Sequence, residues 1–187
     1  MAPGVTSPTV RRGRPRNVGT DRLILDAVRS LLVEHGYTGL TIEAVAARAR
    51  VGKSTVYRRW TSKADLVVDA VVDTLAPVLD APPEATPQEL LHALVEALSR
   101  PEARAAFLAV ISESAVDAVV RERVVHRLIE PSRRLVERCS AGVVTSIEPD
   151  LLFDLVAGAV IHRVLIRGEG GDRRFIEALL DAVRVER

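Results

Sequence analysis

Apolar side chains recur at the spacing of an α-helix along most of this chain, in segments that end at glycine or proline. The first segment begins at Asp21 and stops at Gly36, a residue suited to the left-handed cap that ends a helix. Residues 141–148 are ambiguous, and no other stretch shows convincing strand alternation. Further helical segments cover residues 88–99, 102–116, 118–140, 150–167 and 173–185. The pattern predicts an all-α fold.

Two of the expected helices are short and lie close together. Thr41 is a good N-cap for the first of them. After a turn at 50–52, another short helix begins at Lys53 and reaches about Trp60. Two short helices joined by a tight turn are the form of a helix-turn-helix, in which one helix enters the major groove of DNA and the other braces it.

A fourth helix follows this pair. Ser62 and Asp65 resemble a capping box at its start, and Pro77 should stop it. A proline-rich linker over 79–87 separates it from the later helices. We therefore expect a disordered basic arm, an N-terminal DNA-binding module of three helices with a connecting helix to about residue 77, and a larger C-terminal helical domain. Their boundaries are 1–19, 20–66 and 78–187.

Charge is distributed unevenly along the chain. Residues 1–63 carry a net charge of +8 and the remainder carries −7, although the whole chain stands at +1. A basic first third is the electrostatic footprint of nucleic-acid binding, whereas an acidic remainder would be repelled by phosphates. The alternative is a solubilising tail beside an ordinary domain.

The second short helix of the pair should be the one that contacts bases. It would turn Val56 and Trp60 toward the supporting helices, so that Trp60 is a core aromatic. An exposed Tyr57 phenol suits a phosphate. The side chains that would face outward can donate hydrogen bonds to base edges or phosphates: Lys53, Ser54, Tyr57 and Arg58.

An ordered series of short motifs covers about residues 20–66. It consists of Ile24-Leu25-Asp26-Ala27, Gly36-Tyr37, Leu40-Thr41-Ile42-Glu43-Ala44-Val45-Ala46, Val51-Gly52-Lys53-Ser54-Thr55-Val56-Tyr57-Arg58-Arg59-Trp60 and Ser62-Lys63-Ala64-Asp65-Leu66. In its residues and spacing the series resembles the TetR family of bacterial regulators. Arg50 stands where that family commonly has glycine, and Trp60 where phenylalanine is common. A non-glycine residue in a left-handed turn costs roughly 1 kcal/mol.

The resemblance implies a set of DNA contacts on a double-stranded operator. It implies base contacts from Lys53, Ser54, Tyr57 and Arg58, and phosphate contacts from Thr41, Thr55, Tyr57, Arg59 and Lys63. A dimer bound at a promoter can block polymerase without further contacts, so repression of a palindromic operator is the default expectation. Release by a small-molecule effector is what the family implies.

The basic N-terminal arm could extend this footprint. Arg12, Arg14 and Arg16 lie in an Arg-Pro segment that is similar to the core of an AT-hook. Such a segment can lie in a narrow minor groove, where negative potential is concentrated. A solvated tail with loose attraction to DNA is the equal alternative.

A dimer surface is needed, because one recognition helix spans too few base pairs to select a single genomic site. The segment 150–167 is apolar around most of its circumference, and Gly158 and Ala159 permit close approach. In the family the last two long helices pair with their mates. Residues that fit this role are Leu155, Gly158, Ala159, Ile176, Leu179, Leu180 and Val183, with burial inside one subunit as the alternative.

The resemblance to the family implies an effector site between the DNA-binding module and the dimer surface. Phe107, Ile111, Ser112 and His126 could line it, since such sites are mostly apolar with a few polar groups. Core packing explains these residues equally well. The histidines show no metal-ligand spacing, so we expect neither a metal nor a cofactor.

Two other classes of function are the alternatives. An enzyme is disfavoured, because the chain has no nucleophile elbow, phosphate loop or metal-binding histidine motif. An architectural DNA-binding protein that is indifferent to sequence would depend mainly on the arm. The single cysteine, Cys139, the polar N-terminus and the absence of a long uninterrupted apolar run lead us to expect a cytoplasmic protein without membrane association.

Overall fold

The computed structural model describes residues 18–140 and 147–183, and within these ranges the chain forms helices and turns but no strand. The expected all-α fold is confirmed, and most of the ambiguous stretch 141–148 lies outside the described residues. The elements are α1 (Val18–Gly39), α2 (Ile42–Arg48), α3 (Lys53–Tyr57), α4 (Lys63–Leu79), α5 (Pro87–Ser99), α6 (Pro101–Val116), α7 (Ala118–Val124), η1 (Val125–Ile129), α8 (Glu130–Ser140), α9 (Pro149–Val160), η2 (Ile161–Ile166) and α10 (Arg173–Val183).

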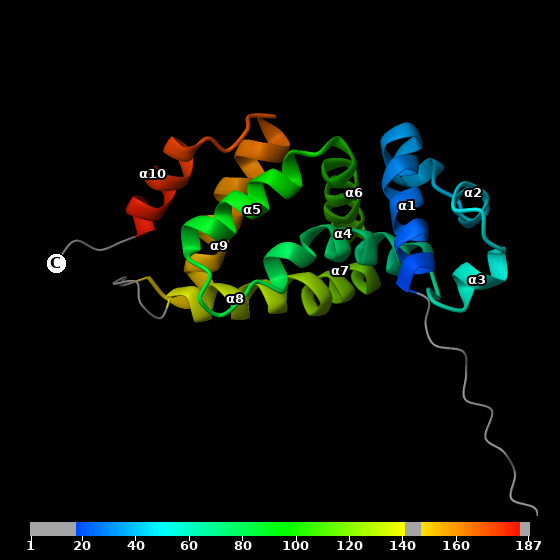
Figure 1. Ribbon diagram of the computed structural model, residues 1–187, viewed down its shortest axis with the longest axis horizontal. Helices are drawn as coiled ribbons and strands as arrows, with labels where there is room; N and C mark the ends of the chain where they lie inside the picture. The colour runs from blue at the N-terminus through cyan, green and yellow to red at the C-terminus, as the bar shows by residue number, and fades with distance from the viewer. Residues whose placement is uncertain (1–17, 141–146, 184–187) are drawn as a thin grey trace, which may run out of the picture.

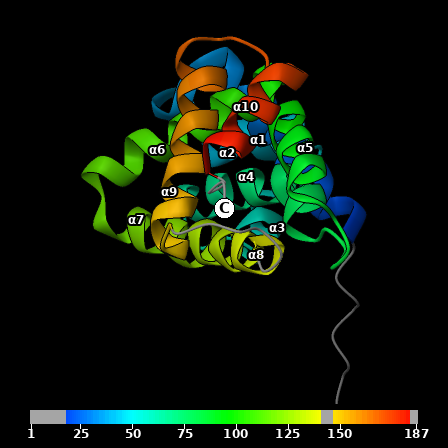
Figure 2. The same cartoon turned by 90° about the vertical axis from the view of Figure 1, so that its left-hand side faces the viewer.

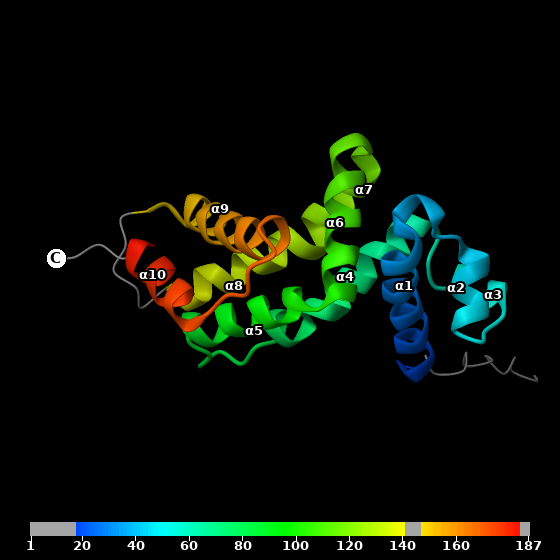
Figure 3. The ribbon, with the colours of Figure 1, turned by 90° about the horizontal axis from the view of Figure 1, so that it is seen from above.

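The helices are arranged along one long axis (Figure 1). α1, α2 and α3 lie together at one end, α10 lies at the other, and α4 runs from the first group into the second. Figure 2 looks along this axis and shows α5, α8, α9 and α10 around the interior of the larger unit. Seen from above, α5 and α9 lie on opposite sides of that unit (Figure 3). The molecule therefore has a small helical end and a larger helical end.

A compact apolar core holds the small end together. Ile24 and Val28 of α1, Val45 of α2 and Val56 of α3 are all completely buried. At Gly36 the backbone adopts φ +64°, a left-handed conformation that glycine tolerates, and the segment up to Gly39 leaves the direction of α1. The expected break at Gly36 is thereby confirmed.

The prediction that Pro77 stops α4 is wrong, because the helix continues to Leu79. A proline lacks only its own N–H donor, and in the last turn of a helix the following residues can still bond. Asp80 N donates to Ala76 O at 2.8 Å, and Val78 is buried. The linker starts only after this last turn, so α4 reaches further into the larger end than the sequence indicated.

The two long helical segments expected over 118–140 and 150–167 are each continuous, but each contains a wider π-helical turn. These turns are η1, between α7 and α8, and η2, after α9. π-type turns are rare and are frequently found at functional sites. Their side chains matter for the cavity described below.

Candidate nucleic-acid interface and ligand cavity

Hydrogen bonds fix the turn between α2 and α3. Thr41 Oγ1 accepts a bond from Ala44 N at 3.1 Å, which confirms the expected N-cap of α2. Among the described residues, Arg50 is the one residue other than glycine whose backbone is left-handed, with φ +53°. Val51 N then donates to Ala46 O at 2.9 Å, so the chain leaves the turn in position to begin α3 at Lys53.

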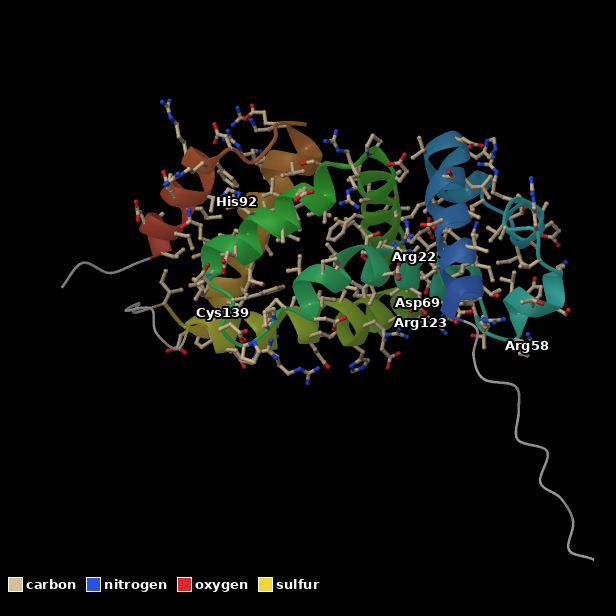
Figure 4. All side chains as sticks on the ribbon, in the orientation of Figure 1. Arg22, Arg58, Asp69, His92, Arg123 and Cys139 are labelled. Carbon is tan, nitrogen blue, oxygen red and sulfur yellow. The ribbon has the colours of Figure 1, made fainter. Side chains whose placement is uncertain are left out.

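The outer face of α3 and its C-cap residue, Arg58, carry the four side chains that were expected to contact bases. Lys53, Ser54, Tyr57 and Arg58 are all exposed, and Tyr57 keeps 48% of its surface accessible. Val56 and Trp60 are buried beneath them, which confirms that Trp60 belongs to the core. The α3 segment lies at the extreme end of the molecule, where Arg58 points outward (Figure 4). A polar face that projects from a supported helix is the geometry for reading a groove.

Lys53 is held by a neighbour on α2. It forms an ion pair with Glu43, and its Nζ lies 5.6 Å from the centroid of the Tyr57 ring. The hydrogen bond between Lys53 and Glu43 lowers the pKa of Glu43 and raises the pKa of Lys53, so both groups are charged at neutral pH. Glu43 therefore orients Lys53 while the DNA is absent.

The residues expected to contact phosphates differ in how exposed their side chains are. Thr41 is exposed and Thr55 is half-buried. Arg59 has a side chain that is only 13% exposed, forms an ion pair with Asp21 and donates from Nη1 to Thr55 O at 3.1 Å.

Lys63 is also engaged inside the molecule. Its Nζ donates to Tyr37 O at 3.0 Å and lies 4.2 Å from the centroid of the Tyr37 ring. A contact from Arg59 or Lys63 to phosphate thus needs a partial exchange of partners. These phosphate roles stay predictions, and the expected arm residues Arg12, Arg14 and Arg16 lie outside the described residues.

Charged side chains join the start of α4 to the long α7–η1 segment. Ser62 Oγ caps α4 by accepting from Asp65 N at 3.0 Å, and it also accepts from Arg123 Nη1 at 2.8 Å. Arg123 forms an ion pair with Asp65 as well. One turn further on, Arg127 Nη2 lies 2.8 Å from Asp69 Oδ1. Figure 4 shows Arg123 and Asp69 together at this junction between the two ends.

The larger end encloses an apolar cavity of about 530 Å³. Its wall comes from α4, α5, α6, α7, η1, α8, α9, η2 and α10, and both π-helical turns contribute to it. The polar side chains in the wall are few: Ser114, Ser132, Cys139 and Asp154. A volume of this size falls within the range of roughly 300–1,000 Å³ that small-molecule sites occupy.

Only part of the expected effector site lies at this cavity. Phe107 and Ile111 line it, but Ser112 is exposed outside the wall on α6. His126 lies in a separate polar groove beside Arg123 and Arg127, with its Nδ1 3.1 Å from Glu130 Oε1. The placement of Ser112 and His126 in one pocket with Phe107 is therefore corrected, since a helical period cannot show which side of α6 or η1 faces inward.

The residues expected at a dimer surface divide into two groups. Leu155 and Gly158 are exposed and Ala159 is half-buried, whereas Leu179 and Leu180 are half-buried against the subunit core. Ile176 is completely buried and Val183 nearly so, which leaves both side chains inside their own subunit. The prediction that these two face a partner is corrected, because α10 packs on α5 and α9.

Sequence reasoning missed two members of the exposed apolar stripe. Leu151 is 53% exposed and Ile166 is 66% exposed, on the same side of the α9–η2 segment as Leu155. Their spacing along the helix was visible in the sequence. Asp154, in the cavity wall, was equally visible as the one acidic residue within the longest apolar run.

Neither a membrane span nor a metal cluster occurs in the part of the chain that the structure describes. None of the described helices is long and apolar enough to cross a membrane. Within the same ranges no cluster of three or more His, Cys, Asp or Glu side chains could hold a metal ion.

This protein joins a helix-turn-helix, which has an exposed polar face, to a larger helical unit that encloses an apolar cavity. That combination is typical of DNA-binding transcription regulators. Residues 24–70 match the family described as bacterial regulatory proteins, tetR family. Residues 87–183 match the tetracyclin repressor-like C-terminal domain. The chain belongs to the TetR family, as the resemblance indicated.

Relatives and solved structures agree with this assignment. The chain is 32% identical over 168 residues to an HTH-type transcriptional regulator of Mycobacterium tuberculosis, covering 86% of this chain and 83% of that protein. It is 26% identical over 186 residues to the DNA-binding transcriptional repressor TetR of Mycobacteroides abscessus, covering 93% and 94%. The crystal structure of the multidrug binding protein EbrR complexed with imidazole has a TM-score of 0.64 at 21% identity, covering 89% and 96%, and shares the fold. Both relatives by sequence are named as transcription regulators.

Proposed function

We propose that this protein is a homodimeric repressor that binds a palindromic operator through α3 and leaves it when a small molecule enters the cavity. The observation that carries the proposal is the outer face of α3. Lys53, Ser54, Tyr57 and Arg58 are all exposed there, while Val56 anchors the helix in the core. Side chains of these types can form hydrogen bonds with base edges in the major groove.

Recognition of a palindrome requires two copies of α3 at a fixed separation of about 34 Å or a multiple of it. The exposed stripe formed by Leu151, Leu155 and Ile166 supports a partner surface on α9 and η2. Gly158 leaves open space where a side chain would begin, which permits a close helix–helix approach. A second copy of the same stripe would cover this apolar surface in a symmetric dimer.

Release by a ligand needs a structural link between the cavity and α3. η1 supplies one, because its Leu128 and Ile129 line the cavity while Arg127 on the same turn contacts Asp69 of α4. Asp69 in turn accepts a hydrogen bond from Trp60, just beyond α3. A ligand that displaces η1 would shift the start of α4 and change the separation of the two recognition helices. The repressor named among the relatives and the ligand-binding structural neighbour EbrR are consistent with this proposal.

The test begins with the recovery of bound DNA. Purified protein is incubated with sheared genomic DNA from its source, and the bound fragments are sequenced. A Lys53→Ala, Arg58→Ala variant is compared with an Arg138→Ala, Arg174→Ala variant, which loses the same charge from exposed positions in the larger end. We expect one or a few inverted repeats, recovered by the wild type and by the control variant but lost by the α3 variant.

Other outcomes would contradict separate parts of the proposal. Uniform recovery of fragments would favour an architectural DNA-binding protein. The recovered site is then placed at a promoter in a purified transcription reaction, where the proposal predicts reduced transcript. An increase in transcript would show that the protein is an activator.

A further inference from the structure

Among the described residues, the wall of the cavity has one charged side chain, and its charge is negative. The remaining residues of the wall are aliphatic or aromatic apart from two serines and Cys139. Asp154, on α9, is the exception, and no Arg, Lys or His among the described residues lines the cavity. The electrostatic character of the wall therefore depends on Asp154.

The carboxylate of Asp154 is not neutralised within the described part of the chain. It forms no ion pair or hydrogen bond there, whereas the neighbouring acidic residue on α9, Asp150, is paired with Arg133. Other acidic residues near the ends of the larger unit also have partners, such as Glu130 with His126 and Glu169 with Arg167. Asp154 thus carries a negative charge beside an apolar surface, with no partner among the residues that the structure describes.

This arrangement discriminates between ligands by the sign of their charge. An anionic head group, such as the carboxylate of a fatty acid, would be repelled by Asp154 and would find no cationic partner in the described wall. A cationic head group would be attracted, and the apolar body of the same molecule would fill the space between α5, α6, α8 and α9. Since Asp154 is exposed to solvent, water weakens the attraction without reversing it.

We infer that the ligand of this cavity is an apolar molecule with one positive charge, of the class of lipophilic amines and quaternary ammonium compounds, with its cationic head at Asp154. This inference rests on the proposed function, because it names the chemical class of the molecule that would release the operator. The apolar residues of the wall, such as Phe107, Phe153 and Leu128, would hold the hydrophobic body.

Three ligands with the same ten-carbon chain test the charge preference. Decyltrimethylammonium, 1-decanol and decanoate are titrated calorimetrically into the full-length protein at neutral pH, each below the concentration at which it aggregates. The wild type should bind the ammonium most tightly and decanoate most weakly. In Asp154→Asn the ammonium should lose roughly two- to fivefold of its affinity relative to decanol, which is the size expected for an exposed charge pair.

A matched variant isolates the position of the charge. Glu148→Gln removes the same charge just before α9 but outside the cavity wall, and the ratio of ammonium to decanol affinity should stay that of the wild type. Thermal unfolding of each variant checks that the fold is retained. Tighter binding of decanoate than of the ammonium, an unchanged ratio in Asp154→Asn, or no binding of any of the three would overturn the inference.

The same ligands separate this inference from the proposed function. If decanoate binds best and releases the operator, the ligand class is wrong and release by a ligand stands. If the ammonium binds in the expected order but the operator stays bound, the ligand class stands and release by a ligand is wrong.

Discussion

Trp60 and Asp69 are joined by a 2.9 Å hydrogen bond from the indole Nε1 to Oδ2, across the junction between the recognition helix and α4. The other oxygen of the same carboxylate lies 2.8 Å from Arg127 Nη2 on η1. One side chain thus holds the end of the DNA-binding module and the turn that borders the cavity. Asp69 is the residue through which we expect the two ends to be coupled.

Replacing Asp69 with alanine should lower stability and weaken the coupling. The change leaves the N–H of the buried Trp60 without its partner. Removal of a hydrogen bond to a partly exposed carboxylate such as that of Asp69 costs about 1–2 kcal/mol. Chemical denaturation should show this decrease in the free energy of unfolding. Operator affinity without ligand should change less than the concentration of ligand needed for release, which should rise.

The matched variant Arg127→Ala removes only the exposed half of this bridge. Its guanidinium side chain is 56% exposed, so the free energy of unfolding should fall by less than about 1 kcal/mol. Equal destabilisation by the two variants would show that the Trp60 hydrogen bond contributes nothing of its own.

Asp65 should make stability depend on pH at the acidic end. Burial alone would raise the pKa of Asp65, but hydrogen bonds from Thr61 and Ser62 and the charge of Arg123 outweigh it and hold this pKa below its usual value. A carboxyl group with a lowered pKa contributes stability above the pKa of the unfolded chain, near 3.9, and loses it as the pH falls through the folded pKa.

The measurement compares wild type with Asp65→Asn in denaturation experiments from neutral pH to about pH 3. The difference in the free energy of unfolding should be largest at neutral pH and should shrink below about pH 4. A difference that grows as the solution is acidified would contradict the assigned role of Asp65.

Arg50 should affect stability and DNA binding in opposite directions. Its left-handed backbone favours glycine, so Arg50→Gly should raise the free energy of unfolding by about 1 kcal/mol. If the exposed guanidinium binds one phosphate, the same change should weaken operator binding and lower the slope of its salt dependence by about 0.9. Stabilisation with unchanged salt dependence would leave Arg50 as a turn residue without a role on DNA.

Leu155 should control assembly of the dimer. A glutamate at this position would place a second negative charge beside the exposed Asp154 in the stripe, and the dissociation constant of the dimer should rise roughly a hundredfold. Val116→Glu is the control, because Val116 is 82% exposed on α6 rather than on α9 or η2. Analytical ultracentrifugation should find the Leu155 variant dissociated at concentrations where wild type and control are dimers; equal behaviour of the two variants would place the interface elsewhere.

The small end was largely predictable from the sequence. Thr41 and Gly36 act through neighbours a few residues away, so local spacing was enough to place them. Pro77 misled the prediction because a proline signals a break but does not say whether the last turn can close without its N–H. Local chemistry defines helix starts better than helix ends.

The larger end was less predictable, because its important interactions join residues distant in sequence. Helical periodicity placed Ile176 on an apolar face but could not say whether that face meets its own subunit or a partner. The same limit applies to Ser112 and His126, which share a region with Phe107 but point elsewhere. The bridge between Asp69 and Arg127 links two helices whose packing has no signature in either segment.

The central claim is that α3 reads bases, and the ratio of two affinities tests it most directly. The dissociation constant of the wild type is measured for the recovered operator and for a scrambled duplex of equal length at the same salt concentration. The proposal predicts a preference of about a thousandfold or more for the operator, lowered in Arg58→Ala, whereas Arg138→Ala should keep it. A wild-type ratio close to one would contradict the claim and identify a DNA-binding protein indifferent to sequence.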